Sequence, residues 1–135
     1  MFLMLLLASA QDNQATPQRN EPTVYTENSV YDMVTEKSKF IGGEDEQVKF
    51  IKNNLKYPVN ALKNGIQGTV FIKFIVERDG SINKNSVEVR RTIDPELDAE
   101  AVRVVKLMPN WTIPRQQDKP VRQNIIIPVR FRISK

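Results

Sequence analysis

The chain has no cysteine and no histidine among its 135 residues. Disulfide bonds, thiolate chemistry, zinc sites built on these residues and histidine-based acid–base catalysis are therefore excluded. The missing cysteine is compatible with an oxidising compartment, although it does not identify one. With 40% apolar and 27% charged residues, the composition is typical of a globular domain, and the length allows one domain and a tail.

The N-terminal apolar run, within residues 1–10, is too short to cross a bilayer as a helix. It ends in Ala8-Ser9-Ala10, which resembles the cleavage site of a secretory signal. The positively charged start of such a signal is missing, as it would be if the recorded start lay inside a longer leader. A buried N-terminal strand is the alternative, but the polar residues 11–20 follow directly. We predict that residues 1–10 are a signal-peptide remnant and that the chain is exported.

Residues 11–38 are predicted to form a flexible tether and N-terminal segment, because residues 11–22 are polar and contain two prolines. Residues 39–135 are predicted to form the folded domain. Its last part, residues 101–135, carries eight lysines and arginines against one acid. This basic surface could face nucleic acid, anionic lipid, peptidoglycan or an acidic peptide, or it could be a solvated face that keeps the protein in solution.

Two helices are expected. The first begins after Gly42-Gly43, because three acids that complement the helix dipole follow, and it ends before Pro58. Its apolar stripe is Val48, Ile51 and Leu55. The second begins at Asp94-Pro95, where the aspartate caps free amides and the proline has no amide to lose. Its apolar stripe comprises Leu97, Ala101, Val104, Val105 and Met108.

Three strands are expected from alternating apolar residues. Residues 69–77 form one wholly apolar face and one half-apolar face, which is typical of a central strand. Asp79-Gly80 provides a hairpin turn, and residues 86–91 return. Residues 121–133 alternate again. The order helix, strand, strand, helix, strand predicts an α+β fold: a two-layer sandwich with a three-stranded antiparallel sheet in the order 2-1-3 and both helices on one face.

Pro128 indicates where the last strand lies in the sheet. A proline cannot donate to a β-ladder, so we expect this strand at the edge, with backbone groups left open. The proline and nearby arginines could simply protect the edge from aggregation. The stretch before Pro128 is less plainly protected, and an extended peptide could add there as a further strand. The candidate binding residues on this stretch are Arg122, Gln123, Asn124, Ile125, Ile126 and Ile127.

Phe71, Ile75 and Ile126 are expected to share the sheet face opposite the helices. An exposed apolar patch usually has a cover. We predict that the cover is residues 23–35 or a second copy of the domain in a homodimer.

No set of residues predicts an enzyme. Catalysis needs a nucleophile with a base, a metal cluster, or paired carboxylates in a cleft. The two acid clusters, residues 44–46 and 96–100, lie at predicted helix starts, where the helix dipole explains them. We expect no catalytic residue, no cofactor and no metal. We also expect no nucleic-acid partner, because Trp111 and Phe131 are predicted to face the core or a helix end instead of stacking on bases.

Short motifs follow one another in an informative order along residues 40–131. They are Phe40-Ile41-Gly42-Gly43, Tyr57-Pro58, Gly65-Ile66-Gln67-Gly68-Thr69-Val70, Asp79-Gly80-Ser81-Ile82, Leu97-Asp98-Ala99-Glu100-Ala101, Met108-Pro109-Asn110-Trp111 and Pro128-Val129-Arg130-Phe131. In this order and spacing, the motifs resemble the C-terminal domain of the TonB family, most closely the form common in Bacteroidetes-type bacteria.

The resemblance implies a periplasmic docking module of an energy transducer, not an enzyme. In the family, the domain binds the TonB box, a short segment near the N-terminus of a TonB-dependent outer-membrane transporter. It passes on force from inner-membrane motor proteins, so that siderophores, vitamin B12 or glycans enter. Here a motor would be engaged only through a membrane anchor upstream. The alternative is a non-transducing module on the same fold that binds peptidoglycan or an anionic surface.

The resemblance also implies two groups of binding residues. The last strand would accept the TonB box by strand addition. The turn around the Tyr-Pro motif would touch the receptor, with the candidate residues Asn53, Asn54, Lys56, Tyr57 and Pro58.

Overall fold

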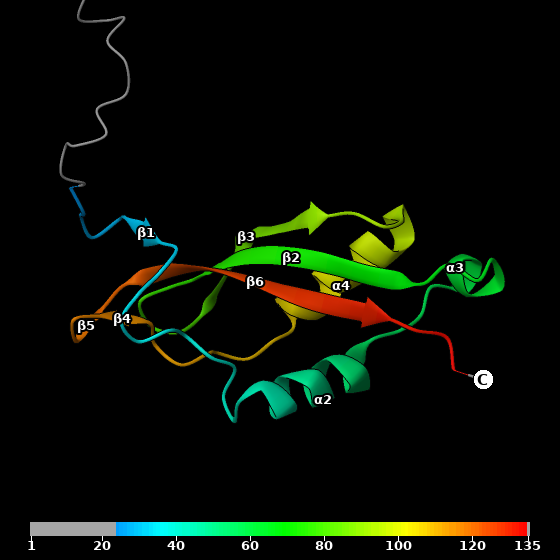
Figure 1. Ribbon diagram of the computed structural model, residues 1–135, viewed down its shortest axis with the longest axis horizontal. Coiled ribbons are helices and arrows are strands. Elements are labelled where there is room, and N and C mark those ends of the chain that lie inside the picture. Colours follow the sequence, from blue (N-terminus) through cyan, green and yellow to red (C-terminus); the bar gives the residue numbers. More distant parts are fainter. Residues whose placement is uncertain (1–23, 135) are drawn as a thin grey trace, which may run out of the picture.

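The computed structural model describes residues 24–134, and Figure 1 shows how its elements are arranged. The helices are α2 (Glu44–Asn54), α3 (Val59–Lys63) and α4 (Pro95–Lys106). The strands are β1 (Val30–Tyr31), β2 (Gly68–Val76), β3 (Ile82–Arg91), β4 (Arg115–Gln116), β5 (Lys119–Pro120) and β6 (Arg122–Phe131). The predicted α+β class is confirmed. The predicted signal-peptide remnant and residues 11–23 of the predicted tether lie outside the described residues.

The main sheet contains four strands in the order β1-β6-β2-β3. β2 pairs antiparallel with both β3 and β6, because a hairpin leads to β3 and a crossover through α4 leads back to β6. The predicted order 2-1-3 is present as β3-β2-β6. The predicted number of strands is wrong, because β1 adds a fourth strand, parallel to the start of β6. β4 and β5 form a separate two-stranded sheet in the loop before β6.

The core lies between one face of this sheet and the helices. α4 runs behind β2 and α2 lies along the β6 side in Figure 1. The register places Val70 opposite Val129 and Phe74 opposite Ile125, and all four side chains are buried on the helix side. The alternation of side chains along β2 and β6 thus places their buried apolar residues in one core. The whole predicted stripe of α4 is buried with them: Leu97, Ala101, Val104, Val105 and Met108.

α2 packs differently from the prediction. Ile51 is buried and Leu55 packs against the core, but Val48 is 52% exposed. Phe50 packs inward instead, and its ring centroid lies 5.7 Å from that of Phe40, which precedes the helix. The apolar side of α2 is therefore turned towards Phe40, and Val48 is left on the outer side.

Gly80 fixes the β2–β3 hairpin to the loop after α4. Its φ is +88°, and a Cβ at this position would lie 2.3 Å from the carbonyl oxygen of Trp111. The Gly80 carbonyl accepts a 2.7 Å hydrogen bond from the Trp111 N–H. Next to it, the Asp79 carboxylate accepts bonds from the Ser81 hydroxyl and amide, which lower the pKa of Asp79. Only glycine supplies both the positive φ and the close approach.

Backbone and side-chain hydrogen bonds join residues 35–39 to the domain. Glu36 and Arg115 exchange two backbone hydrogen bonds of 2.9 and 3.0 Å. The Ser38 N–H donates to the side-chain oxygen of Gln123 at 2.9 Å. Ser38 and Gln123 are both buried, so this bond satisfies two polar groups that would otherwise be costly to bury.

Candidate functional site

β6 has an outer edge that β1 covers only at its start. β1 pairs in parallel through Val30 with Arg122 and through Tyr31 with Gln123. The prediction that the edge is open from Arg122 onward is therefore wrong for these first two residues. Beyond Gln123, no strand within residues 24–134 pairs with the outer edge of β6.

One hydrogen bond on the neighbouring strand reveals the direction of the amides along β6. The Ile75 N–H donates to Ser86 Oγ of β3 at 2.8 Å, so it points away from β6. Ile75 lies opposite Asn124, and in an antiparallel ladder both members of such a pair turn their amides away from each other. The Asn124 amide therefore points to the outer edge. Because the register is regular, the same direction holds at every second residue: Arg122, Ile126, Pro128 and Arg130.

Pro128 fits this arrangement. It lies opposite Phe71, at a position where β6 donates no ladder hydrogen bond to β2, so its missing N–H costs the sheet nothing. In the parallel register Tyr31 lies opposite Gln123, between Arg122 and Asn124, so β1 faces the outward amides of these two residues. The edge beyond β1 therefore offers two outward amides, those of Ile126 and Arg130, together with the outward carbonyl groups. The edge position that Pro128 predicted is confirmed for the part of β6 beyond Gln123.

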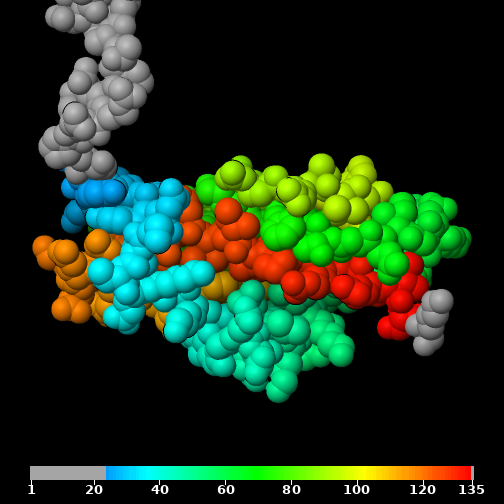
Figure 2. Space-filling view, in the orientation of Figure 1, coloured from blue at the N-terminus to red at the C-terminus, as the bar shows by residue number. Residues whose placement is uncertain are grey.

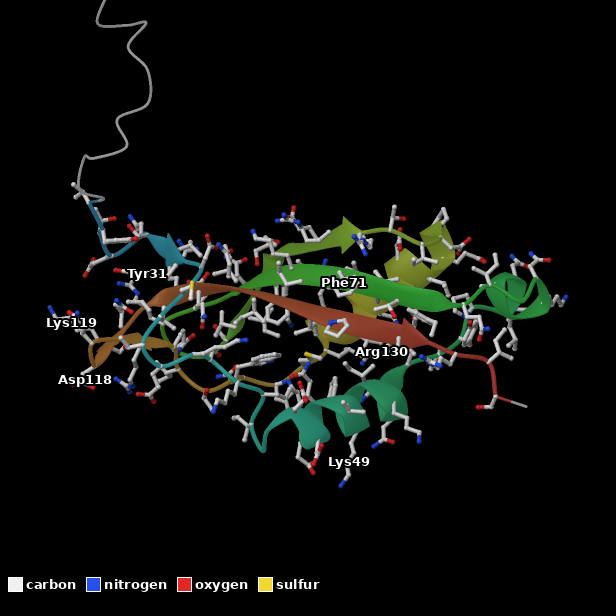
Figure 3. All side chains as sticks on the ribbon, in the orientation of Figure 1. Tyr31, Lys49, Phe71, Asp118, Lys119 and Arg130 are labelled. Carbon is white, nitrogen blue, oxygen red and sulfur yellow. The ribbon has the colours of Figure 1, made fainter. Side chains whose placement is uncertain are left out.

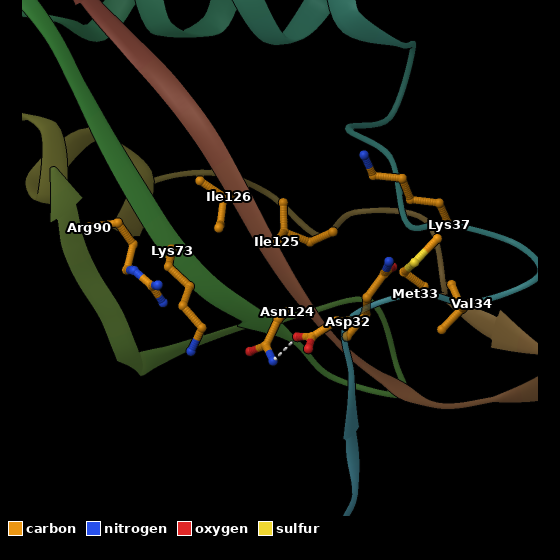
Figure 4. A pocket seen from close by; sticks show the side chains of 10 residues that line it. Asp32, Met33, Val34, Lys37, Lys73, Arg90, Asn124, Ile125 and Ile126 are labelled. Atoms are coloured by element: carbon orange, nitrogen blue, oxygen red, sulfur yellow. Dashed lines mark hydrogen bonds between the residues drawn. The ribbon is translucent and has the colours of Figure 1, made fainter. Parts of the chain in front are cut away.

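A groove of about 600 Å³ lies beside β6 where β1 ends (Figure 4). Asn124 Nδ2 donates to Asp32 Oδ1 at 2.8 Å across its floor, and the buried Asn124 Oδ1 has no hydrogen-bond partner. Cations outnumber anions around the groove, so it carries an excess of positive charge. Its walls are formed by Lys73 and Arg90 on the sheet, and by Asp32, Met33, Val34 and Lys37 of the N-terminal segment.

An ion pair anchors the start of β6. Arg122 donates from Nε and Nη2 to the Glu77 carboxylate at 2.7 and 3.1 Å, and from Nη1 to the Asn28 carbonyl at 2.8 Å. The hydrogen bond from Arg122 lowers the pKa of Glu77, with a further contribution from Asn83, and it outweighs the opposing effect of burial. The pKa of Arg122 is raised in turn. This pair holds β6, the β2–β3 hairpin and the segment before β1 together.

The second group of predicted binding residues lies at the end of α2 and in the turn to α3. Glu100 of α4 organises this turn, because its carboxylate accepts a 2.6 Å bond from the Lys56 N–H and bonds of 2.7 and 2.8 Å from Arg103. Burial raises the pKa of Glu100, but these bonds outweigh burial, so its pKa is lowered. Arg103 also donates to the Asn54 carbonyl at 2.8 Å.

Tyr57 connects this turn to the far end of β6. Its hydroxyl donates to the Ile66 carbonyl, and its ring meets that of Phe131 edge-on, with centroids 5.6 Å apart. Burial raises the pKa of Tyr57. Arg122 and Phe131 are the two ends of a ten-residue strand, which is about 30 Å long. The structure therefore places the two predicted groups of binding residues at opposite ends of β6.

The sheet face opposite the helices is partly apolar. The register places Phe71, Ile75 and Ile126 on this face, as predicted. Figure 2 shows β2 and β6 on the near side with no helix over them, and Figure 3 labels Phe71 there. β1 lies beside β6, and Ile126 is 54% exposed, so residues 24–35 leave the patch open at Ile126. A second copy as the cover stays a prediction.

Two comparisons relate the chain to known proteins. A family model described as "Gram-negative bacterial TonB protein C-terminal" matches residues 53–133. The chain belongs to this family. Two NMR solution structures of Helicobacter pylori TonB-CTD are similar, each with 22% sequence identity. One has a TM-score of 0.49 and aligns over 71% of this chain and 96% of its own; the other has a TM-score of 0.44, with 69% and 88%. No curated protein matches the chain.

TonB C-terminal domains are periplasmic protein-interaction domains and not enzymes, and as a family they interact with outer-membrane transporters. In residues 24–134, no three acidic side chains are grouped so that they could hold a metal ion. Over the same residues, no helix has the length and apolar character needed to span a bilayer.

The sequence does not predict the groove beside β6, because four of its ten lining residues come from the N-terminal segment of this TonB-family domain. These four residues are Asp32, Met33, Val34 and Lys37, which follow β1 in the chain. In the sequence, β1 is indicated only by Val30-Tyr31, a pair of residues that favour strands. Two residues are too few to show the alternation of apolar and polar residues that predicts the longer strands.

Proposed function

We propose that this domain docks the TonB box of a TonB-dependent outer-membrane transporter and so supports energised uptake of nutrients such as siderophores or glycans. The box would add as a strand to the outer edge of β6. The single observation that carries the proposal is the unpaired edge beyond Gln123, with the groove beside it. A regular edge strand with free backbone groups is a template for another strand.

A strand lying along this edge would run from the groove at Asn124 to the turn at Tyr57, because Tyr57 contacts the last residue of β6. One transporter could thus meet both groups of predicted residues. In the second group, the side chains of Asn53 and Lys56 are exposed, whereas the Asn54 side chain is bonded to the Phe50 carbonyl. We therefore assign receptor contact in this turn first to Asn53 and Lys56.

The number of available hydrogen bonds supports weak, reversible docking. With β1 in place, the edge offers two amides and a few carbonyl groups, and each new hydrogen bond contributes about 0.5–1.5 kcal/mol net. Ordering of the guest peptide opposes this gain. A coupler that must release its transporter after each transport event needs such an affinity.

Proline at Ile126 tests the proposal. Ile126→Pro removes one of the two free edge amides but no bond to β2, since this amide points outward. We expect at least a tenfold loss of affinity for a synthetic TonB-box peptide, measured by isothermal titration calorimetry, with little change in the thermal unfolding midpoint. The matched control is Ile126→Ala, which keeps the amide and should retain most of the affinity.

Ionic strength separates this proposal from the envelope-binding alternative. Binding of the peptide by backbone hydrogen bonds should persist in high salt, whereas attraction to a basic surface is screened. Equal binding by Ile126→Pro and the unaltered chain, together with loss of binding in salt, would show that the edge of β6 is not the docking site.

A further inference from the structure

Part of the β6 edge is already occupied by the chain itself. β1 pairs with the first two residues of β6, and Asp32, the residue after β1, accepts a hydrogen bond from the Asn124 side chain. The Arg122 guanidinium binds the Asn28 carbonyl in front of β1 at 2.8 Å. The segment 28–32 thus follows the edge in the place where a guest strand would add.

This occupant is weakly held. Tyr31 stacks on Tyr25, with ring centroids 4.5 Å apart, instead of entering the core, and Tyr25 is itself 56% exposed. Met33 is 86% exposed. The hydrophobic core contains no residue from 24–34. Segments with few buried apolar contacts open locally at a low free-energy cost, without unfolding of the domain.

The chain is held firmly just after this segment. The Thr35 hydroxyl donates to the Arg115 carbonyl at 3.0 Å, and the Ser38 hydroxyl donates to the Thr112 carbonyl at 2.6 Å. The side-chain bond between Ser38 and Gln123 is buried. Release of β1 would therefore end near Thr35, and the rest of the domain would stay in place.

We propose that residues 28–32 are an intramolecular competitor of the guest strand, which must displace them to use the full edge of β6. This inference rests on the proposed function. Release of β1 would raise the number of outward amides from two to four, because those of Arg122 and Asn124 would join those of Ile126 and Arg130. The N-terminal segment would thereby set the affinity of the edge, and anything that pulls on this segment would expose the edge.

A disulfide lock tests the competition within one variant. Asp32 and Asn124 touch through their side chains, and the chain has no cysteine of its own, so D32C/N124C in the full chain can form a single bond. We expect the oxidised form to bind a synthetic TonB-box peptide at least fivefold more weakly than the reduced form. Mass spectrometry confirms the oxidation state, and thermal unfolding confirms that both forms are folded.

A second pair of variants tests the hydrogen bond between Asp32 and Asn124 without introducing cysteines. Asp32→Ala loses the acceptor for Asn124 and should bind the peptide about threefold to tenfold more tightly than the unaltered chain. Asp32→Asn keeps an acceptor oxygen of the same shape and should bind like the unaltered chain.

The unaltered chain provides a direct readout by NMR. Addition of the peptide should move the amide signals of Val30 and Tyr31 to unfolded positions, while those of Thr35 and Ser38 stay dispersed. Unmoved signals of β1 at saturation, or equal affinities of the oxidised and reduced forms, overturn the competition but leave docking at β6 intact. Failure of the unaltered chain and the reduced variant to bind any TonB-box peptide overturns the proposed function as well.

Discussion

The two edges of the main sheet differ in what they could receive. β3 shifts its register against β2 at two places, whereas β6 keeps one regular register over nine residue pairs. Irregular ladders and charged side chains are the usual means by which proteins protect an edge. The exposed residues of β3 are polar or charged: Lys84, Asn85, Glu88, Arg90 and Arg91. β6 instead exposes Ile126 beside two free amides. Under the proposed function, this difference favours the β6 edge over the β3 edge as the docking site.

β1 adds a second difference between the two edges, because it pairs with β6 and not with β3. A permanent cover would be long and would enter the core, whereas β1 has two residues and stays outside it. Short strands of this kind protect an edge while it is idle. The β3 edge is thus protected by its own sequence, and the start of the β6 edge by β1, which leaves the edge in the competition proposed above.

The largest expected loss of stability concerns the β2–β3 hairpin, on which both edges of the sheet depend. Gly80→Ala places a side chain at φ +88° and against the Trp111 carbonyl, in the hairpin that joins β2 to β3 and supports the loop leading to β6. The unfavourable backbone conformation alone costs about 1–3 kcal/mol. We expect a lower urea midpoint and weaker binding of a TonB-box peptide. Ser81→Ala, which changes the same turn without strain, is the control and should lose much less stability.

The next effect concerns the ion pair at the start of β6. Glu77→Gln removes the negative charge that Arg122 contacts at 2.7 Å, with both side chains about three-quarters buried. We expect a loss of about 1 kcal/mol, at the upper end for pairs near the surface. Chemical denaturation at neutral pH measures it. An unchanged unfolding free energy would show that the pair does not anchor this edge.

The same pair predicts a pH dependence. The pKa of Glu77 is below its ordinary value of 4.5 because Arg122 donates to the carboxylate. Glu77 therefore contributes its full stabilisation above pH 4.5 and loses it as the pH falls through its lower pKa in the folded state. The stability difference between the unaltered chain and Glu77→Gln should shrink in this acidic range. A difference that stays constant would contradict the assignment.

The smallest change in stability is expected at the β3 edge. Lys73 and Glu88 join β2 to β3 across 3.7 Å, and Glu88 is 56% exposed. Glu88→Gln should change the unfolding free energy by less than about 0.5 kcal/mol, because solvent screens the pair. A loss as large as that of Glu77→Gln would remove the proposed difference between the two edges.

The long elements could be predicted from the sequence because each carries its own signal. Asp94 caps α4 with bonds of 2.9 and 3.2 Å to the amides of Glu96 and Leu97, as its position before Pro95 predicted. The alternation of β2 and β6 predicted which residues enter the core. Val48 lies on the outer side of α2 although the apolar stripe predicts it inward, because the stripe alone does not reveal that Phe40 supplies the packing surface.

The candidate site was predictable only in part. Pro128 identified the edge strand through a local property, its missing N–H. β1 depends on contacts between residues 28–32 and residues 122–124, which are about ninety positions apart. A local sequence pattern cannot predict such contacts. The groove arises from these contacts, so it could not be predicted either.

Local sequence patterns are enough to predict the α+β class, the order of the main elements and the position of β6 next to β2, because alternation, capping and turn residues act over a few neighbours. How much of the β6 edge is free depends instead on tertiary contacts. Pairing of β1 with β6 depends on weak contacts between distant segments, and their balance is settled when the whole chain has folded.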